Sequence, residues 1–263
     1  MPELITIPLI SLTILITSVV LLWLWSIRLD NASIIDIFWG PACAIPVWVA
    51  YALSAGYQPR KLLLLTLVTL WALRLAWYLA KRNIGHGEDP RYTAMRAAAP
   101  EGIDPHIFTL KKVFLLQGVI AWLISLPAQL GVIYQHPQQL GWLAWTGMLI
   151  FFIGLFFEAT GDYQLKQFKA KPENKGRLMT TGLWAWTRHP NYFGDATIWF
   201  GLTMIALENP LGLIGIYSPF LMLFFLTKVT GKSLLEKGMR ERYPEYDEYV
   251  RTTSGFFPRP PKK

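Results

Sequence analysis

The sequence is poor in cysteine, in histidine and in charged residues. Its single cysteine, Cys43, excludes an intramolecular disulfide and a metal cluster held by several cysteines. The four histidines show no spacing typical of metal ligands, so we expect no metal site. Two segments with glycine and many polar residues, 83–92 and 176–194, stand out, but neither matches a Walker phosphate loop or a Rossmann fingerprint.

Charge is scarce along the chain, whereas apolar residues come in long runs. Charged residues make up 16% of the 263 residues and hydrophobic residues 53%. Several runs approach or exceed the roughly 20 apolar residues that a helix needs to cross a bilayer. The first run lacks a basic segment before it and is too long for a secretion signal, so we interpret it as the first span. The predicted spans cover residues 4–27, 34–55, 62–81, 110–134, 140–160, 193–208 and 211–231.

Basic residues are distributed unequally between the loops. If the N-terminus lies outside, 22 lysines and arginines fall on the cytosolic side, and two, Arg60 and Lys61, fall on the outer side. Cytosolic loops of membrane proteins carry an excess of Lys and Arg, so this asymmetry predicts a cytosolic C-terminus. The net charge of +8 is then explained by loops on one side of a membrane rather than by binding to nucleic acid.

The chain shows no internal repeat and no low-complexity linker. We therefore predict an all-α, polytopic membrane protein of about seven transmembrane helices, with residues 1–263 forming a single domain. The tail from about residue 232 mixes a few apolar residues with many charges. This pattern predicts an interfacial helix on the cytosolic face that ends near Pro244.

Ionisable residues in or beside apolar spans are candidates for function, because burying charge in a membrane is costly. Asp36 lies in the second span and Arg74 in the third, both near the cytosolic face, so the two could meet. They could form a structural ion pair, or Asp36 could bind a ligand or act in catalysis. Glu158 and Asp162 share one helical face at the predicted end of the fifth span, and Asp195 begins the sixth. These carboxylates are either solvated charges or part of a site.

The segment 176–194 carries the strongest local signal. It reads Gly-Arg-Leu-Met-Thr-Thr-Gly-Leu-Trp-Ala-Trp-Thr-Arg-His-Pro-Asn-Tyr-Phe-Gly. Basic, small and aromatic residues together suit a phosphorylated, ring-containing cofactor. Arginine presents a fork to phosphate, and backbone N–H groups before a helix complement an anion. The segment 83–92, which includes Arg91, has a similar character.

Three stretches of the sequence resemble a known superfamily. The stretch 188–194, Arg-His-Pro-Asn-Tyr-Phe-Gly, resembles the superfamily of steroid 5-alpha-reductases, sterol reductases and isoprenylcysteine carboxyl methyltransferases. Residues 158–164 and 87–92, together with Asp36, look more similar to the bacterial branch of the 5-alpha-reductase-like family. The resemblance runs from about residue 30 to the C-terminus. It implies a seven-helix protein, of a bacterial inner membrane rather than the endoplasmic reticulum, that holds NADPH in a cytosol-facing cavity while a lipophilic enone enters from the bilayer.

The resemblance also implies roles for individual residues. Asp36 matches the acid that binds the substrate carbonyl, although the family usually has the longer Glu there. The tyrosine partner of that acid falls on Trp71, which has no hydroxyl; Tyr78, two turns on, is the candidate to replace it. Arg74 matches the third-span arginine of the family. The residues assigned to the cofactor are Glu158, Asp162, Arg177, Asn191 and Asp195, together with Arg188, His189, Tyr192 and Arg91.

We therefore expect an NADPH-dependent enzyme that reduces a conjugated carbon–carbon double bond in a lipophilic, steroid-like substrate. Asp36, with Tyr78, would hydrogen-bond the carbonyl and stabilise the enolate that forms as hydride reaches the β-carbon, and Arg74 is the third candidate catalytic residue. The alternative is an S-adenosylmethionine-dependent methyltransferase acting on a membrane-bound thiol or amine. A transporter or scaffold is the third possibility, with Asp36 and Arg74 as a structural pair. The lack of paired broken helices in two matching halves argues against a transporter.

Overall fold

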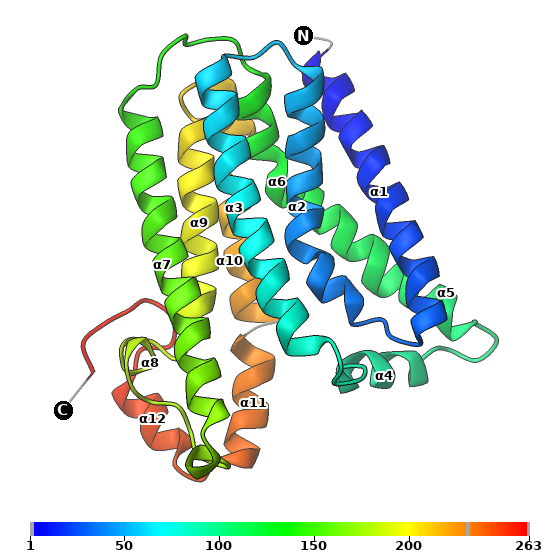
Figure 1. The fold of residues 1–263 in the computed structure, drawn as a ribbon, viewed down its shortest axis with the longest axis vertical. Helices are drawn as coiled ribbons and strands as arrows, with labels where there is room; N and C mark the ends of the chain where they lie inside the picture. The colour runs from blue at the N-terminus through cyan, green and yellow to red at the C-terminus, as the bar shows by residue number, and fades with distance from the viewer. Residues whose placement is uncertain (1–2, 230–231, 262–263) are drawn as a thin grey trace. The chain divides into compact units, whose positions relative to one another are not determined.

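The computed structural model describes residues 3–229 and 232–261. These residues fold into α-helices with short π-helical and 3-10 segments, and no β-strand occurs among them (Figure 1). The all-α class predicted from the apolar runs is therefore confirmed. The chain forms two compact units, one made of residues 1–144 and 205–215 and the other of residues 145–204 and 216–263.

Long apolar helices confirm a multi-pass integral membrane protein. Within the described residues, six stretches are long and apolar enough to span: Glu3–Leu29, Ile34–Leu53, Gln58–Asn83, Pro105–Ile133, Trp142–Ala170 and Pro210–Val229. A further helix, α9 (Pro190–Ala206), corresponds to the short predicted span 193–208 and has 17 residues. The expected count of about seven therefore agrees roughly with the structure, whereas the orientation across the membrane stays a prediction.

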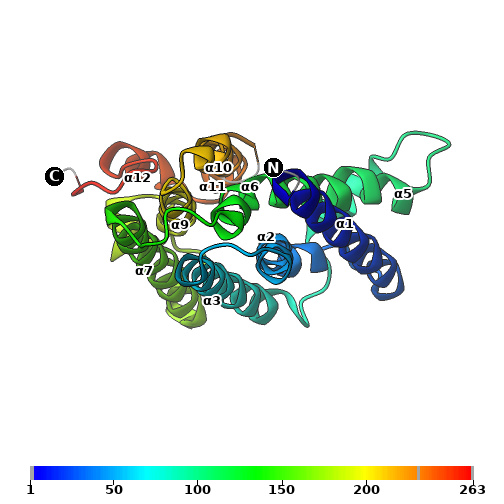
Figure 2. The same ribbon diagram turned by 90° about the horizontal axis from the view of Figure 1, so that it is seen from above.

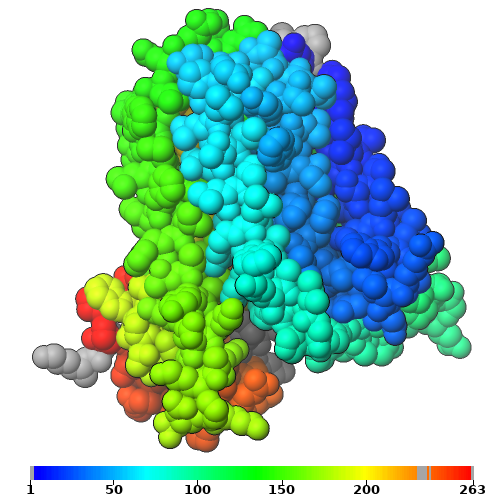
Figure 3. All heavy atoms as spheres, in the orientation of Figure 1, coloured from blue at the N-terminus to red at the C-terminus, as the bar shows by residue number. Residues whose placement is uncertain are grey.

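The first unit is built around α2 (Ile34–Leu53), which lies between α1 (Glu3–Leu29) and α3 (Gln58–Asn83) (Figures 1 and 2). The helix α6 (Leu116–Ile133) packs against all three. A Cβ atom at Gly40 of α2 would lie 2.6 Å from the carbonyl oxygen of Ala72 on α3, so this close approach requires glycine. Figure 3 shows the atoms of α2 filling the space between α1 and α3.

Shorter elements complete the first unit. The helix α4 (Pro90–Ala97) follows α3 after a loop, and α5 (Pro105–Thr109) leads through a π-helical segment, η1 (Leu110–Leu115), into α6. A 3-10 segment, η3 (Pro210–Gly215), belongs to the same unit. The α4 segment therefore lies between two membrane-spanning stretches, in the loop 82–109 that the charge pattern assigns to the cytosol.

The two basic residues predicted to lie outside, Arg60 and Lys61, are both buried. The Arg60 guanidinium donates hydrogen bonds to the carbonyl oxygens of Gly131 at 2.9 Å and Pro137 at 3.0 Å, and to that of Tyr134. The Lys61 ammonium donates to the carbonyl oxygen of Ser54 at 2.5 Å. Both cations therefore donate to carbonyl oxygens at or just beyond the C-terminal ends of helices. These oxygens lack partners within the helix and lie at the negative end of its dipole, so the contacts have a structural role.

In the second unit, α7 (Trp142–Ala170) and α9 approach each other closely through glycines. A Cβ atom at Gly154 would lie 2.6 Å from the carbonyl oxygen of Gly194, and one at Gly201 would lie 2.5 Å from that of Gly147. Small residues let membrane helices bring their backbones together. This contact fixes the start of α9 against the half of α7 that carries Glu158.

The remaining elements of the second unit come after α7 or after α9 along the chain. The tail helix predicted from about residue 232 is α11, and it ends two residues before Pro244; its interfacial position stays a prediction. The elements are η2 (Pro172–Asn174), α8 (Leu183–Trp186), α10 (Ser218–Phe224), η4 (Phe225–Val229), α11 (Lys232–Arg242) and α12 (Tyr246–Thr252).

One predicted boundary is wrong. The fifth span was expected to end near residue 160, but α7 continues as a helix to Ala170. Hydropathy falls after residue 160, but the two Lys and two Gln among residues 161–170 are good helix formers, so the helix continues beyond the apolar run. As a result, Glu158 and Asp162 lie inside the helix rather than at its end. Both are only 3% exposed and are not solvated charges.

Candidate functional site

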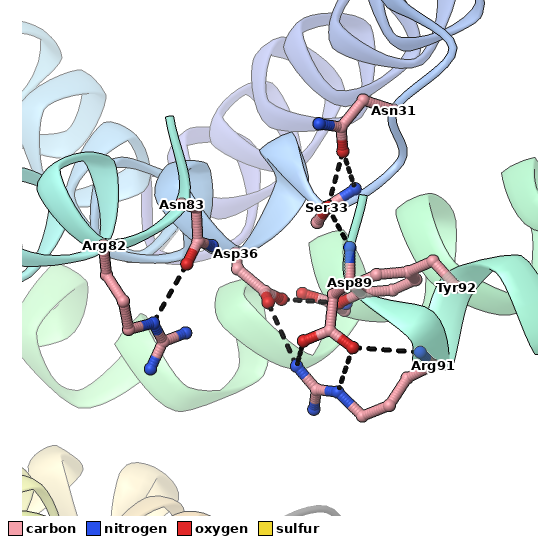
Figure 4. A network of polar contacts seen from close by, with 9 residues as sticks. Asn31, Ser33, Asp36, Arg82, Asn83, Asp89, Arg91 and Tyr92 are labelled. Atoms are coloured by element: carbon pink, nitrogen blue, oxygen red, sulfur yellow. Dashed lines mark hydrogen bonds and ion pairs between the residues drawn. The ribbon is translucent and has the colours of Figure 1, made fainter. Parts of the chain in front are cut away.

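Asp36 occupies the first turn of α2, and the short helix α4 brings a tyrosine to it (Figure 4). The Tyr92 hydroxyl donates a hydrogen bond to Oδ1 of Asp36 at 2.5 Å. The Arg91 guanidinium donates to the other oxygen, Oδ2, at 3.3 Å. Both oxygens of Asp36 therefore face donors, as expected for an ionised carboxylate. We call Asp36, Arg91 and Tyr92 the Asp36 cluster.

The electrostatics of this cluster keep Arg91 and Tyr92 protonated. Arg91 makes two hydrogen bonds to Asp89, from Nε to Oδ1 at 3.0 Å and from Nη2 to Oδ2 at 2.9 Å. This pairing lowers the pKa of Asp89 and raises the pKa of Arg91. Burial raises the pKa of Tyr92, and the negative charge of Asp36 raises it further. A protonated phenol thus contacts a carboxylate in the first turn of a membrane-spanning helix.

The sequence around α4 explains why the helix starts there. Asp89 is its N-cap, and the Asp89 carboxylate accepts the backbone N–H of Arg91 at 2.9 Å. Pro90 takes the first helical position, where its missing N–H costs nothing. The N–H of Asp89 donates to the Ser33 hydroxyl at 3.0 Å, which ties the start of α4 to the start of α2.

A second tie joins α4 to the loop between α1 and α2. The Glu88 carboxylate accepts the backbone N–H of Ala32 at 2.7 Å, the Thr93 hydroxyl at 2.8 Å and an N–H of Arg96 at 2.7 Å. Its side chain is 8% exposed. We call Glu88, Ala32, Thr93 and Arg96 the Glu88 clamp. The clamp holds α4 where Tyr92 reaches Asp36.

The structure gives Asp36 a different cation from the one that the sequence suggested. Within the described residues the ion pair of Asp36 is with Arg91, whereas the Arg74 guanidinium lies over the Tyr78 ring, 5.5 Å from its centroid. The hydroxyl partner of Asp36 is Tyr92 rather than Tyr78. Tyr92 belongs to the segment 83–92, which stood out in the sequence for its polar residues. Its contact with an acid 56 positions earlier could not be predicted from the neighbouring sequence.

In the second unit, Arg188 and His189 share one carboxylate, that of Glu236 on α11. Nε and Nη2 of Arg188 each lie 3.0 Å from Oε1 of Glu236, and Nε2 of His189 lies 3.1 Å from the same oxygen. Burial alone would raise the pKa of Glu236, but the contacts with His189 and Arg188 lower it to about 2. Glu236 is therefore ionised at neutral pH, and sequence reasoning did not find it.

Arg188 is occupied by the protein itself. Besides Glu236, its guanidinium donates to the carbonyl oxygens of Thr253 at 2.7 Å and Val250 at 3.4 Å. A buried arginine with these partners holds the C-terminal region in place. This geometry argues against the expected use of Arg188 as a phosphate ligand.

The other residues assigned to the cofactor lie on α7, on α9 and in the loop between them. The Asn191 amide donates to Oδ1 of Asp162 at 3.1 Å, which joins α9 to α7. The His189 and Tyr192 rings stack, with centroids 5.5 Å apart. Glu158 and Asp195 are both buried.

Two further assignments fall elsewhere. Arg177 is exposed in the loop that follows α7, and Arg91 belongs to the Asp36 cluster. No group of three or more His, Cys, Asp or Glu residues in the described part of the chain is placed to hold a metal ion. The roles of all these residues stay predictions.

The long apolar helices define the class of protein as a multi-pass α-helical membrane protein. The chain belongs to the family described as "Protein of unknown function (DUF1295)", whose model matches residues 22–253. This family assignment agrees with the extent of the resemblance seen in the sequence.

Relatives of this chain include two kinds of enzyme. An uncharacterised protein of Schizosaccharomyces pombe is 26% identical over 90% of this chain and 76% of its own length. The protein-S-isoprenylcysteine O-methyltransferase of Xenopus laevis is 25% identical over 67% of this chain and 62% of its own length. The steroid 5-alpha-reductase DET2 of Gossypium hirsutum is 29% identical over 28% of each chain. No solved structure matches the chain.

Proposed function

We propose that the protein is an NADPH-dependent reductase of a conjugated carbon–carbon double bond in a lipophilic, steroid-like enone. The observation that carries this proposal is the hydrogen bond from Tyr92 to Asp36 in the first turn of a membrane-spanning helix. Reducing an enone requires hydrogen-bond donors at the carbonyl and a source of one proton, and a phenol beside a carboxylate supplies both. The similarity to a steroid 5-alpha-reductase, although short, supports the same chemistry.

The residues of the second unit fit a nucleotide cofactor. Asp162 and Asn191, joined by a hydrogen bond, offer acceptors and donors of the kind that ribose hydroxyls and a carboxamide need. Glu158 and Asp195 add buried carboxylates. The exposed guanidinium of Arg177 is suited to a phosphate, whereas Arg188 is already committed to Glu236. We therefore assign the phosphate to Arg177.

The reaction consumes one enone, one NADPH and one proton, and yields the saturated ketone and NADP⁺. When bound, NADPH supplies the hydride for the β-carbon. A proton taken up by the Asp36–Tyr92 pair gives it a second donor hydrogen, which we assign to the carbonyl oxygen. That hydrogen bond stabilises the negative charge that develops on the oxygen as the hydride arrives. The pair then gives up this proton to the enolate oxygen, and tautomerisation of the enol places a proton on the α-carbon, so that one proton is consumed and the pair returns to its starting state. Arg91, tied to Asp89, keeps the Asp36 carboxylate oriented.

The proposed setting follows from the apolar surface of the helices. A lipophilic substrate dissolves in the bilayer and reaches a site beside the start of α2 from within the membrane. We place the protein in a bacterial inner membrane, with membrane lipid as its surroundings. Nucleic acid is not among the proposed partners.

A methyltransferase is the second candidate, and one observation favours it. The isoprenylcysteine O-methyltransferase of Xenopus laevis matches 67% of this chain, whereas the steroid 5-alpha-reductase matches 28%. Under this alternative, the second unit binds S-adenosylmethionine, and the methyl acceptor is a lipid-linked group. In that reaction we assign no proton transfer to the Asp36–Tyr92 pair.

Cofactor titrations separate the two candidates. In isothermal titrations of the purified protein, we expect NADPH to bind about tenfold or more tightly than NADH, because one charge-assisted hydrogen bond to the 2′-phosphate is worth roughly 1.5–3 kcal/mol. Arg177→Gln should remove this preference and leave NADH binding unchanged. Binding of S-adenosylmethionine without binding of either nicotinamide nucleotide would transfer the assignment to the methyltransferase.

A further inference from the structure

The C-terminal segment of the second unit is paired with the segment that precedes α9. The backbone N–H of Arg188 donates to the carbonyl oxygen of Ser254 at 2.9 Å, and the N–H of Arg259 donates to that of Trp186 at 2.9 Å. We call residues 253–259 the C-terminal strap. Arg188 pairs with Ser254 and Trp186 with Arg259, so the strap runs antiparallel to residues 186–188. The pairing is part of the fold rather than a loose tail contact.

Thr187 lies at the centre of this pairing and is fully buried. Its hydroxyl donates a hydrogen bond to the carbonyl oxygen of Phe256 in the strap at 2.8 Å. The Thr187 hydroxyl oxygen, Oγ1, also accepts a hydrogen bond from the backbone N–H of His189 at 3.3 Å. One hydroxyl therefore joins the strap to the residue that immediately precedes α9.

The strap also packs on the first turn of α9. The Phe193 ring meets the rings of Phe256 and Phe257 edge to face, with centroids 6.0 and 6.2 Å apart. These contacts hold the turn that carries Asn191, whose amide donates to Asp162. The position of Asn191 thus depends on a chain of contacts that starts at the strap, and Thr187 is the side chain that links the strap to the backbone of His189.

We propose that Thr187 is a positioning residue for the cofactor site: its hydroxyl fixes the start of α9, and the C-terminal strap is its anchor. The inference rests on the proposed function, in which Asn191 and Asp162 bind the nucleotide. Thr187 touches no cofactor in this account and acts through His189 and Asn191. Valine keeps the branched shape of threonine but leaves the carbonyl oxygen of Phe256 and the N–H of His189 without the hydroxyl, so the change should loosen the start of α9.

The test compares three full-length variants. Thr187→Val removes the hydroxyl, Thr187→Ser keeps it, and Thr203→Val removes another buried threonine hydroxyl from α9. Thr203 is a matched control, because its hydroxyl has no hydrogen-bond partner among the described residues. Hydrogen–deuterium exchange of the peptides covering 186–193 and 253–258 is measured together with the NADPH dissociation constant.

We expect Thr187→Val, which removes two hydrogen bonds, to speed exchange in both peptides and to weaken NADPH binding about three- to tenfold. Thr187→Ser and Thr203→Val should stay close to the wild type in both measurements. Unchanged exchange in Thr187→Val would overturn the proposal, as would equal loss of affinity in Thr187→Val and Thr203→Val. If the wild type binds S-adenosylmethionine instead of NADPH, the proposed reduction fails alone, and the same comparison with S-adenosylmethionine as the probe decides the role of Thr187.

Discussion

Tyr92→Phe is expected to lower the turnover of enone reduction about a hundredfold or more, while cofactor affinity and melting temperature stay close to those of the wild type. The phenol supplies the hydrogen bond that meets Asp36 and, in the proposed reaction, a proton for the developing enolate. Phenylalanine keeps the ring and its packing and removes only the hydroxyl. The measurement is the steady-state rate of NADPH oxidation with a lipophilic enone, with separate titrations for affinity.

Tyr134→Phe is the matched control for this variant. Tyr134 belongs to the same unit, is also buried, and its hydroxyl has no hydrogen-bond partner among the described residues. Burial raises its pKa to about 12, so it too is a protonated phenol at neutral pH. We expect full activity in this variant. A normal rate in Tyr92→Phe combined with a large loss in Tyr78→Phe would return the hydroxyl role to Tyr78, the residue that the sequence suggested.

Glu88→Gln should destabilise the protein by about 1.5–3 kcal/mol, the value of hydrogen bonds to a charged group, and reduce turnover at the same time. The change removes the carboxylate that the half-buried guanidinium of Arg96 contacts and leaves it, among the described residues, only the exposed Asp30, 3.6 Å away. It also weakens the acceptor for the N–H of Ala32, so the helix that carries Tyr92 loses its tie to the start of α2. Thermal unfolding in detergent and the rate of reduction are the two measurements.

Two variants make this prediction specific to the Glu88 clamp. The double variant Glu88→Met with Arg96→Met removes both charges and should recover much of the lost stability. Glu248→Gln breaks the exposed ion pair with Arg251, and it should change stability by no more than about 1 kcal/mol. Equal losses in Glu88→Gln and Glu248→Gln would contradict the account of the clamp.

Sequence patterns predicted the spans well because crossing a membrane imposes a length and a composition on each helix. The predicted spans 4–27 and 34–55 differ from Glu3–Leu29 and Ile34–Leu53 by at most two residues at each end. The end of α7 was missed by ten residues because its last turns lie in charged sequence that hydropathy does not recognise as helix. A helix end outside the membrane is set by capping and contacts rather than by hydropathy.

The contacts of the site were harder to predict than its residues. Asp36 was singled out because a carboxylate in an apolar span is unusual, but its partners lie 55 and 56 positions away along the chain. Arg74 was the cation that helix positions alone placed near Asp36, whereas the position of α4, which supplies Arg91 instead, could not be predicted from the sequence. Arg188 was assigned to a phosphate for its residue type, yet its guanidinium is occupied by Glu236 and by carbonyl groups. Residue type indicates what a side chain can bind, and only the fold decides which partner it meets.

The central claim is that hydride passes from NADPH to the β-carbon of an enone. The most direct measurement uses NADPH labelled with deuterium at C4 of the nicotinamide, in each of its two stereoisomers, with a panel of lipophilic enones that includes a 3-oxo-4-ene steroid. The account predicts a saturated ketone that carries one deuterium at the former β-carbon, from one stereoisomer only, and no such product with the Tyr92→Phe protein over the same period. A protein that leaves the whole panel unreduced, but transfers the methyl group of S-adenosylmethionine to a prenylated cysteine, would contradict it.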